Sequence, residues 1–314
     1  MNISSLEPMH LLLAGVVVLL LVASLAGWAL SHRITGDAGQ ETVRNLNARI
    51  KAWWVMVAIF AVAFVAGKGV TIILFAAVSF YCLREFYSIT PTHPSDHAAM
   101  AAAFYIFLPL QYWLVWIDWV TMLTILIPVY SFLALPVLSM LKGVTADYLQ
   151  RVSKIQWGLM LGVFCVSHAP ALLMLDLGGH PPVNLLFFLI TVVQLSDVLQ
   201  YVAGKLFGRT KLAPNVSPSK TVEGLVIGGL AATAVGAGLW WITPFEPHEA
   251  AIMAFAIVVA GALGGLVLSA VKRSLGAKDW GVMIQGHGGA LDRMDSVTFA
   301  APLFFHLTHY FFAN

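Results

Sequence analysis

Acidic side chains with a regular spacing mark a short polar segment near the end of the chain, residues 272–296. Asp292 and Asp295 lie three residues apart, so a helical turn there places both carboxylates on one face, near Asp279. Three carboxylates so close together repel one another and require a compensating cation. Mg²⁺ is usually held by carboxylate oxygens completed by substrate phosphates, whereas Zn²⁺ favours Cys and His. The segment therefore predicts a magnesium site that binds a polyphosphate.

The same segment contains groups that suit phosphate. The glycine pair Gly288 and Gly289, directly after His287, allows backbone N–H groups to approach phosphate oxygens closely. The basic residues of this segment are Lys272, Arg273, Lys278 and Arg293. By composition alone, a solvated connector with balanced charges is the competing interpretation.

A second polar segment, residues 201–221, precedes another apolar run. Ser217 followed by Pro218 is typical of a helix start, with Ser as the N-cap and Pro at the first helical position. Such a start directs free N–H groups and the positive end of the helix dipole towards an anion. An ordinary capped helix competes with this interpretation. Asp197 lies just before the segment, at a depth where an acid is costly unless it functions or pairs with Lys205.

Long apolar runs must position these segments. Of the 314 residues, 60% are hydrophobic and 10% are charged, which indicates a bilayer as the solvent. The runs are 9–31, 52–67, 69–83, 99–116, 119–140, 157–175, 183–200, 222–242, 250–271 and 297–313. They predict an all-α, polytopic membrane helix bundle with about ten transmembrane or membrane-embedded helices. Residues 52–83 are either two spans or a re-entrant hairpin.

The basic residues predict the orientation of these helices. Threading the chain through a bilayer places sixteen of the 17 Lys and Arg residues on one side and only Lys68 on the other. Because Lys and Arg accumulate in cytoplasmic loops, both polar segments should face the cytoplasm. We expect residues 1–156 to form a set of N-terminal membrane helices and residues 157–314 to form a C-terminal set of membrane helices that carries both polar segments. Glu85 is expected to pair with Arg84 or with a loop cation.

Glycines spaced four residues apart predict close packing of helices within residues 157–314. The two pairs are Gly224 with Gly228 and Gly261 with Gly265. Each pair allows the backbone of a neighbouring helix to approach closely.

The order of residues in the first segment resembles the hallmark of the phosphatidate cytidylyltransferases, also called CDP-diglyceride synthases. The matching residues are Ser269, Lys272, Arg273, Lys278, Asp279, Gly281, His287, Gly288, Gly289, Asp292, Arg293 and Asp295. The second segment is similar to the family's other shared stretch. Its matching residues are Asp197, Tyr201, Gly204, Lys205, Phe207, Gly208, Lys211, Pro214, Ser217, Pro218, Lys220, Thr221, Glu223 and Gly224. The resemblance covers roughly residues 190–310 and departs from the family at Val198 to Gln200, Gln285 and Ala290.

This resemblance implies transfer of CMP from CTP to phosphatidic acid, giving CDP-diacylglycerol and pyrophosphate for phospholipid biosynthesis. It implies that Asp279, Asp292 and Asp295, with Asp197 nearby, hold Mg²⁺, and a second monovalent or divalent cation is left open. The expected catalytic residues are these three C-terminal aspartates with Lys272, Arg273, Lys278, Arg293 and His287. The expected substrate-binding residues are Ser217, Lys220, Thr221, Ser269, Gly288, Gly289, Lys205 and Lys211.

The expected partners are CTP, phosphatidic acid or a related lipid phosphate, and membrane lipids, without nucleic acid. A homodimer is left open. The expected location is a bacterial cytoplasmic (inner) membrane, with the active site facing the cytoplasm. Alternatives are a CTP-dependent enzyme acting on another lipid phosphate or alcohol, such as a polyprenyl-type kinase, a transporter, and an inactive scaffold. Acids gathered at one membrane face disfavour transport, which usually places ionisable groups near the midplane.

Overall fold

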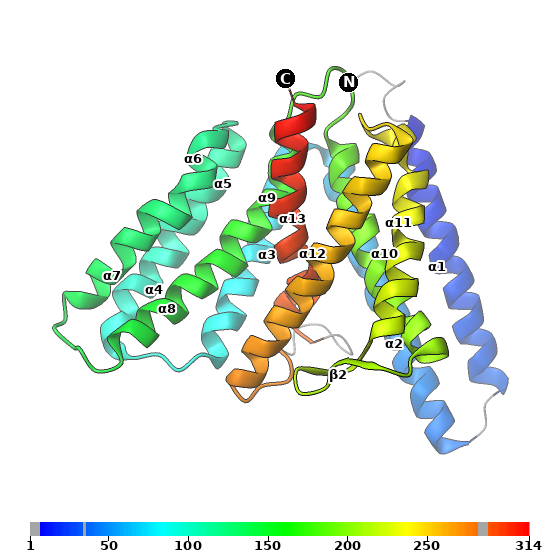
Figure 1. The fold of residues 1–314 in the computed structure, drawn as a ribbon, viewed down its shortest axis with the longest axis horizontal. Helices are drawn as coiled ribbons and strands as arrows, with labels where there is room; N and C mark the ends of the chain where they lie inside the picture. The colour runs from blue at the N-terminus through cyan, green and yellow to red at the C-terminus, as the bar shows by residue number, and fades with distance from the viewer. Residues whose placement is uncertain (1–6, 34–35, 282–287, 314) are drawn as a thin grey trace.

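The computed structural model describes residues 7–33, 36–281 and 288–313, and the chain is a bundle of long helices (Figure 1). Each predicted apolar run lies in a helical stretch, to within a residue at its ends. Within the described ranges, β-structure consists of one two-stranded sheet. The predicted all-α bundle is confirmed.

The first three helices form two successive hairpins. They are α1 (Glu7–Arg33), α2 (Asp37–Ala66) and α3 (Lys68–Ile89). Gly67 alone separates α2 from α3, with a φ of 95° that glycine adopts without steric cost. The Gly67 N–H and the Thr71 hydroxyl both donate to the Ala63 carbonyl, each over 3.1 Å. Residues 52–83 therefore belong to two separate helices joined by a tight turn.

Three further helical stretches form an arm on the left of Figure 1. They run over Pro94–Trp116, Val120–Met140 and Tyr148–Met174. Each stretch contains a short π-helical segment, whose turns are wider than those of an α-helix. The pieces are η2 (Pro94–Asp96), α4 (His97–Ala102), η3 (Ala103–Phe107), α5 (Leu108–Trp116), α6 (Val120–Ile125), η4 (Leu126–Ser131), α7 (Phe132–Met140), α8 (Tyr148–Leu159), η5 (Met160–Cys165), α9 (Val166–Ala171) and η6 (Leu172–Met174).

The remaining elements form the right-hand part of the bundle. They are α10 (Val183–Phe207), β1 (Lys211–Ala213), β2 (Ser217–Thr221), η7 (Gly224–Gly228), α11 (Gly229–Gly238), η8 (Trp240–Ile242), α12 (Pro247–Ser274) and α13 (Ala290–Phe312). The strands pair antiparallel, with Ala213 opposite Ser217 and Lys211 opposite Thr221. Helix α13 packs against α12 and α10 and also against α3 and α9. It therefore joins the two parts of the molecule.

The glycine pairs lie at contacts between helices, as predicted, and the approach is closest at Gly224 and Gly228. A Cβ atom on Gly224 would lie 2.7 Å from the Gln200 carbonyl oxygen of α10, and one on Gly228 would overlap the Gln200 backbone. A Cβ atom on Gly261 would lie 3.4 Å from Ser296 Cβ of α13. These contacts bring α10, α12 and α13 together behind the polar segments.

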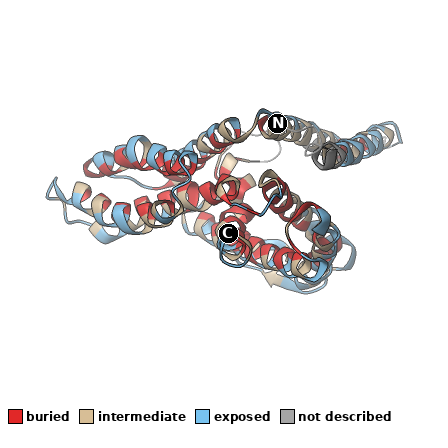
Figure 2. Ribbon diagram, turned by 90° about the horizontal axis from the view of Figure 1, so that it is seen from above, coloured by how far each residue is buried: buried red, intermediate tan, exposed pale blue. Residues whose placement is uncertain are grey.

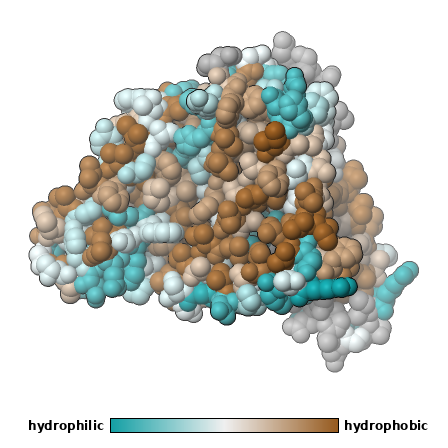
Figure 3. Space-filling view, viewed as in Figure 1, coloured by the Kyte–Doolittle hydropathy of each residue, from teal (hydrophilic) through white to brown (hydrophobic). Residues whose placement is uncertain are grey.

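The surface has the pattern expected of an integral membrane protein. Seven helical stretches of the described residues are long and apolar enough to cross a bilayer. Figure 3 shows apolar side chains across the middle of the molecule and polar side chains gathered along its lower edge. Buried residues line the faces on which helices meet (Figure 2). The sheet and the connection between α12 and α13 lie at the lower end (Figure 1), so both polar segments share one end of the bundle.

Candidate active site

Two carboxylates from different helices meet at one serine. The Ser296 hydroxyl donates to the Asp197 carboxylate, with its oxygens 3.1 and 3.0 Å away, and lies 3.5 Å from Asp295 Oδ1. Asp197 belongs to α10 and Asp295 to the second turn of α13. Neither carboxylate forms an ion pair with any described residue. The pair therefore concentrates negative charge that the described side chains leave only partly compensated.

Two basic side chains lie close to this pair without forming ion pairs with it. A Cβ atom on Gly265 would lie 2.9 Å from Lys220 Nζ and 4.0 Å from Asp295 Oδ2, so glycine leaves room for the ammonium group beside Asp295. The positive charges of Lys220 and Arg293 act on both carboxylates. Arg293 Nε is buried and has no hydrogen-bond partner among the described residues. These donors suit a phosphate bound next to the carboxylate pair.

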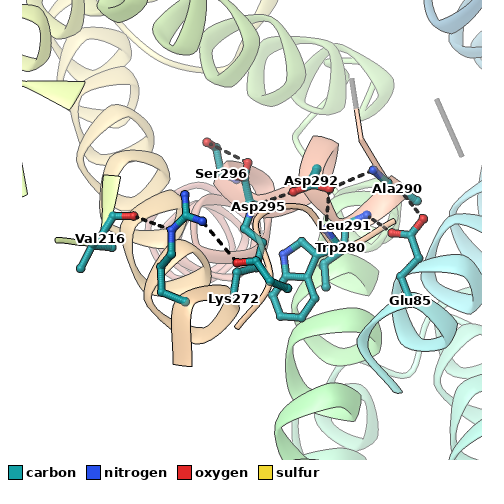
Figure 4. A network of polar contacts seen from close by, with 12 residues as sticks. Glu85, Val216, Lys272, Trp280, Ala290, Leu291, Asp292, Asp295 and Ser296 are labelled. Carbon is teal, nitrogen blue, oxygen red and sulfur yellow. Dashed lines mark hydrogen bonds and ion pairs between the residues drawn. The ribbon is translucent and has the colours of Figure 1, made fainter. Parts of the chain in front are cut away.

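Asp292 is already fully engaged by protein groups. Its Oδ1 accepts from Lys272 Nζ over 2.6 Å, and its Oδ2 accepts from the backbone N–H of Trp280 over 2.8 Å and of Gly289 over 2.9 Å. Asp292 and Lys272 are both buried. Figure 4 shows this network on one side of Asp295. In this arrangement Lys272 and Asp292 hold the connection between α12 and α13 in place.

The structure does not bring the three predicted aspartates together. No three Asp, Glu, His or Cys side chains in the described part of the chain form a group that could hold a metal ion. Asp279 is exposed and forms no hydrogen bond or ion pair with the described residues. Since α13 begins at Ala290, Asp292 lies in its first turn and folds back onto the Gly289 N–H. Asp295, one turn later, instead lies beside Asp197.

The other predicted groups of the connection have separate locations. His287 lies outside the described residues. Gly288 has a φ of 79°, and the Gly289 N–H donates to Asp292, so that N–H is not free for phosphate. Ser269 is half-buried in α12, and Lys278 is exposed. Arg273 is exposed, and its guanidinium donates to the carbonyls of Val216 and Ala277, each over 3.4 Å.

The predicted helix start at Ser217 is wrong, because Ser217 and Pro218 lie in β2. The chain turns back on itself here, and Ser217 pairs with Ala213 of β1. The helical stretch begins directly after Thr221, whose hydroxyl oxygen accepts the Gly224 N–H over 3.1 Å as an N-cap does. Thr221 is buried, whereas Lys220 reaches the carboxylate pair from the same strand.

The Glu223 carboxylate binds the backbone directly before the two-stranded sheet. Glu223 accepts the backbone N–H groups of Arg209 and Thr210 over 3.0 and 3.1 Å. The N–H of Arg209, followed by other backbone donors, lowers the pKa of Glu223 to about 2. Glu223 thereby fixes the turn through which the chain leaves α10.

Two predicted basic residues lie away from the carboxylate pair. Lys205 is exposed and lies over the ring of Tyr201, 5.8 Å from its centroid, so the alternative of a pair with Asp197 is wrong. Lys211 is exposed in β1.

Glu85 is the residue that sequence reasoning missed. It forms no ion pair with Arg84 or any other described cation, and it accepts the backbone N–H groups of Ala290 and Leu291, each over 2.9 Å. The only sequence signal was an acid near the end of an apolar run. Nothing in that signal pairs Glu85 with a helix that begins 205 residues later.

Most of the chain is similar in sequence to known proteins. Residues 47–311 match the model of a family described as the cytidylyltransferase family. The uncharacterized protein YnbB of Escherichia coli (strain K12) is 34% identical over 306 residues, which are 95% of this chain and 97% of that protein.

Two relatives with a stated activity match a shorter part. The phosphatidate cytidylyltransferase of Synechocystis sp. (strain ATCC 27184 / PCC 6803 / Kazusa) is 39% identical over 135 residues, 41% of this chain and 46% of that protein. The phosphatidate cytidylyltransferase of Staphylococcus aureus (strain COL) is 38% identical over 114 residues, 36% of this chain and 44% of that protein. The chain thus spans less than half the length of these two relatives.

Proposed function

The chain belongs to the cytidylyltransferase family and is a membrane-embedded nucleotidyltransferase, and we propose that it transfers CMP from CTP to phosphatidic acid. The products are CDP-diacylglycerol and pyrophosphate. The observation that carries the proposal is the Asp197 and Asp295 pair beside Lys220 and Arg293, which form no ion pairs with it. Half-buried acids without their own cation, next to basic groups at one end of a membrane bundle, suit a charged substrate that reaches the membrane surface.

Asp197 and Asp295 fit a magnesium site. They share one hydroxyl group and form no ion pair with a described residue, so a cation would balance their charge. Two carboxylates completed by substrate phosphates are a usual ligand set for Mg²⁺. When bound, the ion would neutralise phosphate charge and polarise the oxygens around the reacting phosphorus. A second, monovalent or divalent, cation is part of the same proposal.

The side chains of this site would act mainly by positioning and charge neutralisation. An oxygen of the lipid phosphate attacks the α-phosphorus of CTP, and the bond from that phosphorus to the pyrophosphate leaving group breaks. Lys220 and Arg293 would hold phosphate oxygens against their mutual repulsion. Lys278 and Arg273, exposed at the surface, would attract CTP. Because the attacking phosphate is already ionised, the reaction requires neither a protein nucleophile nor a strong base.

The location of the site suits an acceptor that stays in the bilayer. The carboxylate pair lies towards the polar end of helices whose middle parts are apolar (Figure 3), so a lipid headgroup could reach it while its acyl chains remain among the helices. The excess of Lys and Arg at this end supports a cytoplasmic location for the site, where CTP would be available.

Labelled CTP tests the reaction. The purified protein in vesicles with phosphatidic acid and Mg²⁺ should transfer label from the α-phosphate of CTP to the lipid and release pyrophosphate. Label entering the lipid from the γ-phosphate would instead establish a lipid kinase. A parallel reaction with a polyprenyl phosphate tests the acceptor, and the variant Asp295→Asn is the control. Absence of both transfers and of metal-dependent CTP binding would contradict the proposal.

A further inference from the structure

Glu85 lies against the connection between α12 and α13 at two places, although it belongs to α3. Its Oε1 accepts the Ala290 N–H and its Oε2 accepts the Leu291 N–H, each over 2.9 Å (Figure 4). Midway along the connection, a Cβ atom on Gly281 would lie 2.8 Å from Oε1, and one on Gly289, directly before α13, would overlap the carboxylate. Glycine at both positions lets the backbone lie directly against Glu85.

The next residue of α3 strengthens the same contact. Phe86 stacks on Trp280, with ring centroids 5.2 Å apart and planes inclined by 22°. Trp280 is fully buried, and its backbone N–H donates to Asp292. One turn of α3 therefore supports the connection through a carboxylate and a ring. Among the described residues, no other element of the N-terminal membrane helices makes a polar contact with this connection.

The Glu85 carboxylate supplies hydrogen-bond acceptors to the first turn of α13. The first N–H groups of a helix have no partners within the helix, and an anion near that end also interacts favourably with the helix dipole. Gly289, the N-cap residue, has no side chain to supply an acceptor. Asp292 satisfies the Gly289 N–H, and Glu85 satisfies the two that follow. Without Glu85, two N–H groups would lose their acceptor beside a buried acid, so the first turn would shift.

We propose that Glu85 is a positioning residue for CMP transfer, because its carboxylate fixes the first turn of α13, which contains Arg293 and leads directly into the turn that contains Asp295. The inference rests on the proposed function, since it assigns Glu85 a role in that reaction. Glu85 itself does not contact the substrate, as both of its oxygens bind backbone N–H groups. A displacement of reacting groups by about 1 Å lowers rates about 100-fold, so an error in this turn is costly.

The experiment compares Glu85→Ala, Glu85→Gln and Glu85→Asp with Asp96→Asn, which changes another buried acid at the same end of the bundle. All are measured below the unfolding temperature of the least stable variant. We expect kcat to fall about 100-fold in Glu85→Ala and about tenfold in Glu85→Gln, with partial rescue in Glu85→Asp. The KM for phosphatidic acid should change less than about threefold, because the lost group acts on the reacting geometry.

A second readout does not depend on activity. Hydrogen exchange at the amides of Ala290 and Leu291 should accelerate in the Glu85 variants and stay at the wild-type rate in Asp96→Asn. Wild-type kcat and exchange in Glu85→Gln would overturn the proposal. The proposal would also be overturned if Asp96→Asn lost as much kcat as the Glu85 variants, while hydrogen exchange at residues 290 and 291 stayed unchanged in the Glu85 variants. If the wild-type protein does not transfer CMP, the proposed function fails, whereas the exchange data still decide whether Glu85 fixes the turn.

Discussion

Two acidic clusters at the same end of the bundle, one buried and one half-buried, differ in how their charge is balanced. In the left arm, Asp96 accepts from Arg151 Nε over 2.9 Å, and the other nitrogens of that arginine donate to the carbonyls of Ala146 and Val144. In the right-hand part, Asp197 and Asp295 share the Ser296 hydroxyl and form no ion pair with a described residue.

The difference separates a structural cluster from a functional one. Arg151 pairs with Asp96 through Oδ2, so the charge of that cluster is balanced within the protein, although Asp96 Oδ1 has no hydrogen-bond partner among the described residues. The Asp197 and Asp295 pair is completed only by something that binds to it. Breaking a buried ion pair should therefore cost stability, whereas removing one of two like charges should cost activity.

Asp295→Asn should have the largest effect. We expect CMP transfer to fall by about 1000-fold, because the site loses one of the two charges proposed to hold Mg²⁺. Thermal unfolding should stay unchanged or rise, since Asp197 loses a repulsive neighbour. Initial rates with labelled CTP and the unfolding temperature measure both. Near-normal transfer by this variant would show that the pair is not the reaction centre.

Asp96→Asn should show the opposite pattern. The change leaves Arg151 buried without its counter-charge and should lower the free energy of unfolding by about 3 kcal/mol. The rate of CMP transfer per folded molecule should remain near that of the wild type. Denaturant titration and rate measurements on the same sample test this. A stable variant with low activity would remove the contrast between the two clusters.

Gly265→Ala tests whether Lys220 acts at the carboxylate pair of the right-hand part. The new Cβ atom would lie 2.9 Å from Lys220 Nζ and would displace the ammonium group. We expect kcat/KM for CTP to fall about tenfold, which corresponds to about 1.4 kcal/mol. Gly261→Ala is the matched control, because its Cβ atom would meet Ser296 at an ordinary 3.4 Å. Equal losses in both variants would assign the effect to helix packing instead of to Lys220.

Glu223→Gln should have the smallest effect and extends the comparison to an acid balanced by backbone N–H groups. The pKa of Glu223 is lowered to about 2, below about 4.3 for an unperturbed Glu. Its stabilising contribution is therefore fully present above pH of about 4.3 and is lost as the pH falls towards 2. We expect the wild type to lose more stability than Glu223→Gln over that interval, as measured by unfolding temperatures at each pH. Parallel curves would contradict this role.

The sequence predicts the helices well and the site only in part. Local composition determines which segments form apolar helices. The spacing of the glycines at 224, 228, 261 and 265 determines where neighbouring helices can approach closely. Spacing also placed Asp292 and Asp295 in one helix. It did not show that Asp292 would turn back to Lys272 and Gly289, because that depends on where α13 begins.

Other features depend on tertiary contacts that no local pattern contains. Ser217 and Pro218 have the chemistry of a helix start, but pairing with β1 overrides that preference. The contact between Glu85 and α13 joins residues far apart in the chain, so it becomes visible only once α3 and α13 are packed together.

That same long-range contact has a consequence for biosynthesis. Translation and membrane insertion proceed from the N-terminus, so α3 enters the bilayer well before α13 is made. Until then the acceptor for the first amides of α13 is present without its donors. The first turn of α13 can therefore reach its native contacts only after a helix translated 205 residues later than Glu85 has been inserted beside α3.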